Sequence, residues 1–200
     1  MPPPPDDHFI PPHGGYEQLL SYQKAVVVYV GTCFFVKKWL PTYGDRTVDQ
    51  MVQAARSGKQ NIVEGSMASG TSKATELKLT NVARASLEEL LEDYQDFLRA
   101  RGSGEWPTDH AYTRRLRVLC RKPDGDYETF KKGIEHEDPL ISANVINGLI
   151  RVTCYLLNRQ IAQLQEIFVE QGGLRERMTQ ARLARRAEQQ RENREKGRRT

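Results

Sequence analysis

Cysteine is scarce in this sequence. Only three of the 200 residues are cysteine, and Cys33, Cys120 and Cys154 are far apart with no C-x-x-C pair among them. An odd number of scattered cysteines argues against a disulfide framework. We therefore expect free thiols in a protein of a reducing compartment.

Long hydrophobic runs are also missing. The most apolar stretch, AVVVYVGTCFFV, covers residues 25–36 and is followed by Lys37 and Lys38. A helix that spans a bilayer needs about 20 apolar residues, so this stretch is better interpreted as a buried helix. The first residues, MPPPPDD, lack the basic and then apolar segments of a secretion signal. We expect a cytoplasmic protein without membrane contact.

The four histidines do not stand in a spacing typical of catalysis or metal binding. Two lie within residues 1–15, His110 is isolated, and His136 belongs to the segment EHED at 135–138. Metal sites in helix bundles use Glu-x-x-His spacing, whereas these four residues are consecutive and precede a helix, which favours capping. A metal-dependent enzyme is the weakest alternative. We expect no enzyme activity, no metal and no cofactor.

A phosphate-binding loop is absent from the sequence as well. Gly58 and Lys59, within RSGKQNIVEG, suggest the pattern G-x-x-x-x-G-K-[ST]. That loop needs a glycine five residues earlier, for the turn onto the phosphates, and a hydroxyl after the lysine, for magnesium. Gln53 and Gln60 occupy those positions, so this segment is not such a nucleotide site.

Positive charge, by contrast, is concentrated at one end of the chain. Residues 174–200 contain nine arginines and one lysine against four glutamates, a net charge of +6. Since the whole chain carries +4, the preceding 173 residues carry −2. A near-neutral body with a basic suffix indicates a polyanionic partner.

The hydrophobic periodicity predicts four long helices. The first covers residues 16–40, and the second begins where Thr47 and Gln50 form a capping box and ends at Gly65. Small residues on the second helix, including Gly58, allow another helix to approach closely. The third follows Ser72 and carries an apolar stripe to about residue 101. The fourth begins where Asp138 caps and Pro139 starts the first turn, and QGG at 171–173 breaks it.

The remaining segments complete an all-α architecture. Six prolines in residues 1–15 indicate a disordered arm. An insertion at 103–137 is expected to hold short helices at 111–122 and 127–134. The predicted fold is an up-down four-helix bundle over residues 16–173 with this small helical insertion, followed by a charged, solvated helix in the basic suffix 174–200.

Two motifs resemble those of a bacterial four-helix-bundle family. The first is the R-S-x-x-x-N-I-x-E-G run at 56–65, and the second is the A-x-x-S-L-x-E-L run at 83–90. The family includes proteins encoded in intervening sequences of 23S ribosomal RNA genes and the accessory variability determinant of diversity-generating retroelements. The resemblance covers roughly residues 16–102 and 140–170. Its motif residues are Arg56, Ser57, Asn61, Ile62, Glu64, Gly65, Ala83, Ser86, Leu87, Glu89 and Leu90.

The resemblance implies an up-down bundle that assembles into a ring, typically a homopentamer. In the retroelement branch, this ring carries a basic surface and binds nucleic acid and a reverse transcriptase. The present sequence departs from the compact pattern in the insertion 103–137 and in the suffix after Gly173, both of which are basic. A second argument for a homo-oligomer comes from the first helix, whose apolar residues exceed what one bundle face needs: Val28, Phe34, Phe35 and Trp39.

Four polar residues of the motifs are expected to be structural. Asn61 and Glu64 lie near the end of the second helix, and Ser86 and Glu89 lie on the helix that should pack against it. Because buried polar groups must be satisfied, we expect a buried hydrogen-bond network that fixes the two helices relative to each other. A functional site is the alternative, but no nucleophile or histidine accompanies these residues.

The basic residues are the best functional lead. Each phosphate that a protein neutralises releases a counterion, and an oligomer multiplies the effect. We expect a non-enzymatic, oligomeric protein that binds RNA or DNA electrostatically and could be an adaptor for a reverse transcriptase or another nucleic-acid enzyme. The alternative is a protein-interaction or assembly module without nucleic-acid binding. The expected nucleic-acid contacts are Lys37, Lys38, Arg56, Lys59, Arg114, Arg115, Arg117, Arg182, Arg185, Arg186 and Arg191.

Overall fold

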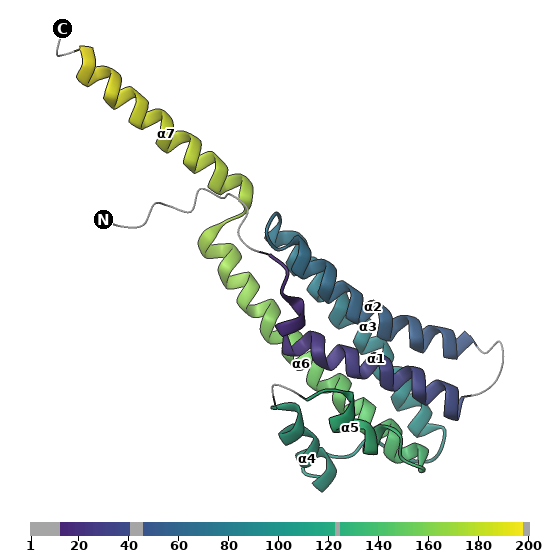
Figure 1. The fold of residues 1–200 in the computed structure, drawn as a ribbon. Coiled ribbons are helices and arrows are strands. Elements are labelled where there is room, and N and C mark those ends of the chain that lie inside the picture. The colour runs from purple at the N-terminus through teal and green to yellow at the C-terminus, as the bar shows by residue number, and fades with distance from the viewer. Residues whose placement is uncertain (1–12, 41–45, 123–124, 198–200) are drawn as a thin grey trace.

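The computed structural model describes residues 13–40, 46–122 and 125–197, and within these ranges the chain is helical with no β-strand (Figure 1). Most of the predicted N-terminal arm lies outside the described residues. The helices are a short 3-10 turn η1 (Tyr16–Gln18), α1 (Leu20–Trp39), α2 (Arg46–Ala68), α3 (Lys73–Arg99), α4 (Ala111–Cys120), α5 (Tyr127–Ile134), α6 (Pro139–Gln171) and α7 (Leu174–Gly197).

Four helices, α1, α2, α3 and α6, pack around the main core. α2 packs on α3, α3 packs on α6, and α1 contacts both α2 and α6. The apolar stripe predicted for the third helix is largely confirmed, since Ala83, Leu87, Tyr94 and Leu98 are all fully buried on α3. These four helices therefore form a helix bundle.

Local capping signals place two helix starts correctly. The side chain of Ser72 accepts a hydrogen bond of 3.1 Å from the backbone N–H of Thr75 at the start of α3. The Asp138 carboxylate accepts one of 2.8 Å from the N–H of Leu140, and Pro139 occupies the first turn of α6. α6 ends at Gly172, whose φ of 65° breaks the helix where the sequence predicted.

Two predicted boundaries of α2 are wrong. Thr47 lies within the helix, which is already formed at Arg46, so Thr47 is not its N-cap. Gly65 does not end the helix, which continues to Ala68. The physical reason is the backbone: Gly65 is buried on α2 and is not among the glycines with positive φ, the conformation that ends a helix.

The insertion is built into the bundle. α4 and α5 pack on α6, and α5 also contacts α1. The loop before α4 is fixed by a hydrogen bond of 2.8 Å from the Trp106 N–H to the Asn144 side chain. In the same loop, Glu105 accepts two hydrogen bonds of 2.7 Å from Arg151. These contacts position α4 beside α6.

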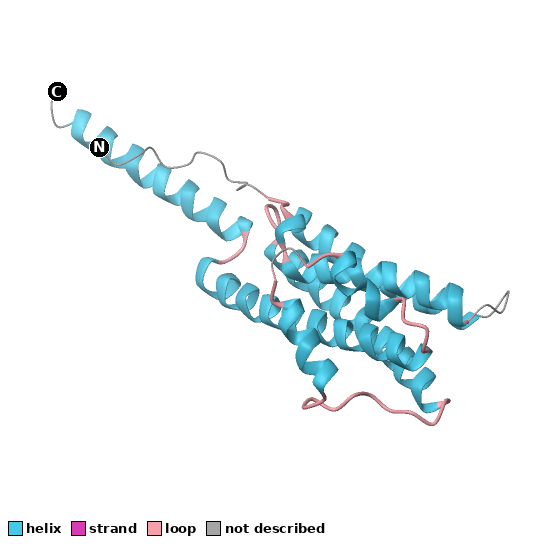
Figure 2. Cartoon of the chain, turned by 60° about the horizontal axis from the view of Figure 1, so that its bottom comes forward, coloured by secondary structure: helices cyan, strands magenta, loops and turns pink. Residues whose placement is uncertain are grey.

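α7 extends away from the bundle (Figures 1 and 2). Most of its described side chains are exposed, including Leu183 at 59%. The predicted solvated helix in the suffix is thus present as a helix, and it begins directly after Gly172 and Gly173.

α6 is a long and strongly apolar helix. By length and composition it could cross a membrane, with a mean hydropathy of 1.5 over 18 residues. However, 56% of that 18-residue stretch is buried inside the protein, and core helices of soluble proteins share this length and composition. The expected absence of membrane contact stays a prediction.

Candidate nucleic-acid interface

α4 and α6 border a groove of about 700 Å³ that is lined by four arginines. Arg117 and Arg121 come from α4 and from the residue after its end, four positions apart. Arg151 and Arg159 come from α6, eight positions apart, and Tyr155 lies midway between them. A spacing of four places side chains on one face of a helix, so two basic stripes face each other across the groove.

The groove exists because α4 sits close to α6. Leu116 and Cys120 are buried on the inner face of α4. Leu116 packs directly over Gly148, where a Cβ atom would overlap its side chain. The short backbone distance leaves the longer arginine side chains of both helices at the edges of the contact, where all four are exposed.

The groove is cationic, although Glu105 neutralises one of its four arginines. Arg151 forms the ion pair with Glu105, and the hydrogen bond with Glu105 raises the pKa of Arg151. Arg117 makes only a long hydrogen bond of 3.4 Å to the Thr108 carbonyl oxygen. The guanidinium groups of Arg121 and Arg159 have no partner within the described residues. Since no carboxylate lines this groove among the described residues, its cationic groups favour an anionic ligand.

An exposed aromatic ring accompanies these charges. Tyr155 is 60% exposed although it lies on an otherwise core-forming helix. Leu20, Val152 and Leu156 contribute an apolar wall beside it. Cationic groups that track phosphates, combined with an aromatic ring on which bases stack, are the means by which proteins bind single-stranded nucleic acid.

Only one predicted contact residue lines this groove. Arg117 does, whereas Arg114 is exposed elsewhere on α4 and Arg115 lines a second cavity. The short helix predicted at 111–122 is present as α4, and its Arg115 and Arg117 line two different hollows, which the sequence did not indicate.

The basic residues predicted on α1 and α2 lie outside the groove. Lys38 is engaged locally, because its Nζ lies 4.7 Å from the Trp39 ring centroid and donates to the His136 carbonyl oxygen at 3.4 Å. Lys59 lies over the Tyr29 ring at 4.9 Å. Lys37 and Arg56 are exposed on α1 and α2. The structure does not bring these four residues together with the groove arginines.

The predicted residues of the suffix form a third basic region. Arg182, Arg185, Arg186 and Arg191 are all exposed on α7, away from the bundle. Arg185 pairs with Glu188 at 3.4 Å, an exposed contact that contributes little to stability. These residues could add phosphate contacts, but they are separate from the groove.

The motif residues form a smaller network than predicted. The hydroxyl groups of Ser57 and Ser86 are 3.0 Å apart, and the Asn61 side-chain amide donates to the Ser57 carbonyl and hydroxyl oxygens at 2.9 and 3.1 Å. Glu64 and Glu89 are exposed, so their predicted burial is wrong. Both carboxylates lie at exposed positions of their helices, whereas Ser57, Asn61 and Ser86 meet at the contact between α2 and α3.

Glu89 instead lines an open groove of about 720 Å³ between α2 and α3, together with Ser57, Ser86 and Asp93. Burial raises the pKa of Asp93, and the nearby carboxylates of Asp96 and Glu89 add to this effect. This second groove is therefore acidic in character, in contrast to the groove between α4 and α6.

The buried cysteines and the EHED segment have structural roles. Burial raises the pKa of the Cys120 thiol to about 11 and that of Cys154 to about 12, so both are poor nucleophiles at neutral pH. In the EHED segment, Asp138 caps α6 and His136 Nδ1 accepts a hydrogen bond from the Asp138 N–H. The described residues contain no group of three potential metal ligands.

Arg151, Tyr155 and Arg159 were not among the contact residues predicted from the sequence. Their signal was present, since they recur every four residues inside a segment whose other positions are mostly apolar. A polar and aromatic stripe on a core helix indicates that this face is left uncovered by the bundle.

The chain matches no protein-family model, and neither the curated proteins nor the solved structures include a significant match.

Proposed function

We propose that this protein binds single-stranded RNA or DNA, without catalysis, in the groove between α4 and α6. The observation that supports this most directly is the convergence of four exposed arginines and the exposed ring of Tyr155 on one groove that has no lining carboxylate. Phosphates would pair with the guanidinium groups of Arg117, Arg121 and Arg159, since guanidinium groups bind phosphate in bidentate geometry and that of Arg151 is held by Glu105. A base would stack on Tyr155.

The test is a salt titration of binding to a fluorescent single-stranded oligonucleotide. Each phosphate contact contributes a slope of about −0.7 to log affinity against log salt for single strands. The double variant Arg121→Gln, Arg159→Gln should therefore reduce the slope by about 1.4 units and weaken binding at low salt. These two arginines are chosen because neither supports the fold through a partner in the described chain.

The matched control removes the same charge elsewhere. Arg84→Gln, Arg99→Gln alters two α3 residues that pair with Glu88 and Asp96 and do not line the groove. If both double variants reduce the slope equally, binding is a general effect of net charge and the groove has no special role. If the unaltered protein binds no oligonucleotide at low salt, the proposal is wrong.

We also propose an up-down layout of the bundle and its assembly into a ring. The short connection between α2 and α3, residues 69–72, favours antiparallel neighbours, and the contacts of α6 with both α1 and α3 support an up-down four-helix layout. The resemblance to the intervening-sequence family then suggests a ring, with an adaptor role for a reverse transcriptase or another nucleic-acid enzyme as its functional consequence. The process would take place in the cytoplasm.

A second candidate function is assembly through protein contacts. It is favoured by the exposed apolar residues near the end of α6, where Val169 is 83% exposed and Phe168 is 38% exposed. In contrast, Val28 and Phe35, which suggested an apolar excess on the first helix, are fully buried within one chain. Light scattering should give about five times the chain mass of 22.9 kDa for a pentamer. A constant mass near that of one chain would exclude a stable ring.

A further inference from the structure

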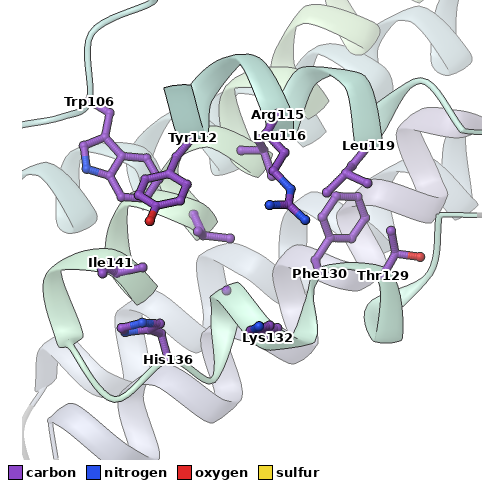
Figure 3. Close-up of a pocket in the computed structure, with 12 residues that line it drawn as sticks. Trp106, Tyr112, Arg115, Leu116, Leu119, Thr129, Phe130, Lys132, His136 and Ile141 are labelled. Atoms are coloured by element: carbon purple, nitrogen blue, oxygen red, sulfur yellow. The ribbon is translucent and has the colours of Figure 1, made fainter. Parts of the chain in front are cut away.

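A second cavity, of about 300 Å³, lies along a different face of α4 (Figure 3). Tyr112, Arg115, Leu116 and Leu119 line it, a spacing of three, one and three residues that follows one helical face. Leu116 also borders the α4–α6 groove, so α4 separates the two hollows. The volume is at the small end of the range for ligand pockets.

Aromatic side chains stand at both ends of this cavity. Figure 3 shows Trp106 and Tyr112 side by side at one end and Phe130 at the other. The ring centroids of Trp106 and Tyr112 are 5.1 Å apart, with an interplanar angle of 32°. Ile141 and Val145 from α6 add apolar surface. Such walls favour a flat, apolar body that can pack against aromatic rings.

Three cationic or hydrogen-bonding side chains come from three separate segments. Arg115 of α4 extends between the aromatic ends, across from Lys132 of α5 and His136 of the following loop (Figure 3). Neither the Arg115 guanidinium nor the Lys132 ammonium has an ion pair or hydrogen bond within the described chain. His136 accepts a hydrogen bond at Nδ1 from the Asp138 N–H, so its neutral ring carries the proton on Nε2. That nitrogen is available as a donor.

No carboxylate lines the cavity among the described residues, so no lining group neutralises Arg115 and Lys132. We propose that this cavity binds a small planar aromatic anion, that is, one ring system carrying a carboxylate or a phosphate. The ring packs between Trp106, Tyr112 and Phe130, and the anionic group is held by Arg115 and Lys132. This ligand site is independent of strand binding in the α4–α6 groove, since Leu116 alone is shared by the two linings.

Tryptophan fluorescence provides a direct readout, because the chain contains two tryptophans and Trp106 lines the cavity. Trp39→Phe leaves Trp106 as the single emitter and keeps an aromatic ring at position 39, whose Nε1 has no hydrogen-bond partner among the described residues. This protein is titrated with AMP and with benzoate, which share the proposed chemistry but represent a nucleotide and a carboxylate source. Adenosine supplies a ring without the anion, and inorganic phosphate supplies the anion alone.

The expected result is a saturable change of Trp106 emission with AMP or with benzoate. Tighter binding of AMP indicates a nucleotide ligand, and tighter binding of benzoate indicates a carboxylate ligand. Adenosine and phosphate should each bind roughly tenfold or more weakly, since each lacks one half of the recognition. Arg115→Gln, Lys132→Gln should weaken binding by a similar factor. Arg114→Gln is the matched control, because Arg114 is an exposed neighbour that does not line the cavity.

Different results would contradict the aromatic-anion site and the binding of single-stranded nucleic acid in the α4–α6 groove. No saturable signal with either anion, or equal affinity for adenosine and AMP, excludes an aromatic-anion site. Unchanged affinity in Arg115→Gln, Lys132→Gln, with its helical content retained, does the same. Arg121→Gln, Arg159→Gln should leave the binding of AMP and benzoate intact, because neither residue lines this cavity. A failure of oligonucleotide binding in the α4–α6 groove would therefore leave this test unaffected.

Discussion

Lys24 and Gly125 are joined by a hydrogen bond of 2.7 Å from the lysine Nζ to the glycine carbonyl oxygen, although 101 positions separate them in the chain. Lys24 is fully buried on α1, and its ammonium group also lies 5.3 Å from the Phe130 ring centroid. The contact connects the bundle to the segment between α4 and α5. It therefore helps to hold the insertion, and with it both hollows beside α4, in place.

Replacing Lys24 by methionine should destabilise the protein. The substitution keeps an unbranched side chain but leaves the buried Gly125 carbonyl without this donor, which costs about 1–3 kcal/mol. Urea unfolding followed by circular dichroism measures the free energy. Lys37→Met is the control on the same helix, where an exposed side chain should change stability by less than about 0.5 kcal/mol. Equal stability of the two variants would show that the buried ammonium has no structural role.

The contact between Ser57 and Asn61 can be isolated by a double-mutant cycle. Ser57→Ala and Asn61→Ala, alone and together, should give a coupling energy of about 0.5–1.5 kcal/mol, since their side chains share a hydrogen bond of 3.1 Å. Helix propensity cancels in such a cycle. The same cycle with Glu64→Ala in place of Asn61→Ala should give no coupling, because Glu64 is exposed. Coupling to Glu64 as large as that to Asn61 would restore the larger network predicted from the sequence.

Local signals explain which parts of the fold were predictable. Ser72 and Asp138 cap their helices through backbone groups two or three residues away, so the sequence contains both partners of each contact. The stripe on α3 is regular because that helix packs against both α2 and α6. Glu64 and Glu89 were misplaced because spacing gives the relative orientation of side chains on a helix but not which side faces the neighbour.

The groove between α4 and α6 could not be predicted from spacing alone. Its geometry depends on contacts across 38 and 46 positions of the chain, from Trp106 to Asn144 and from Arg151 to Glu105. No local pattern indicates those pairs. The stripe of Arg151, Tyr155 and Arg159 was visible in the sequence, but its significance appears only when α4 is placed beside it.

Gly58, which first suggested a phosphate-binding loop, has a packing role that can be tested. A Cβ atom at this position would lie 2.7 Å from both Cγ and Cδ2 of the fully buried Leu87. Gly58→Ala should therefore be destabilising by about 1–3 kcal/mol through overpacking, offset by about 1 kcal/mol of improved helix propensity. Thermal unfolding should show a lower melting temperature.

Leu87→Ala in the Gly58→Ala background is the informative control. If the loss comes from steric overlap, the two substitutions should be less destabilising together than the sum of their separate effects. Strict additivity, or a raised melting temperature for Gly58→Ala alone, would contradict the packing role.

Deleting residues 174–200 should separate stability from binding. The described side chains of α7 are largely exposed, so the melting temperature of the bundle should hardly change. The deletion removes a net charge of +6, so affinity for RNA or DNA at low salt should fall by roughly tenfold or more, with a flatter salt dependence. Binding is measured by the same oligonucleotide titration.

Point substitutions test whether charge or the helix itself matters. Replacing Arg182, Arg185, Arg186 and Arg191 by glutamine keeps a good helix former at each position and should reproduce much of the loss. If the truncated protein binds as tightly as the full chain, the suffix is not a nucleic-acid contact.

The length of α7 sets how far its charges can act. Its 24 residues span about 36 Å at a rise of about 1.5 Å per residue, whereas ionic screening under physiological salt limits electrostatic reach to about 8 Å. The charges of the outermost arginines are therefore screened from a ligand bound beside α4. Only a nucleic acid long enough to contact both the groove and α7 can connect them. A duplex, whose phosphates are spaced about 3.4 Å apart along each strand, needs roughly ten base pairs to run the length of this helix. Only oligonucleotides long enough to reach both the groove and the suffix would gain the additional affinity of a second anchoring point.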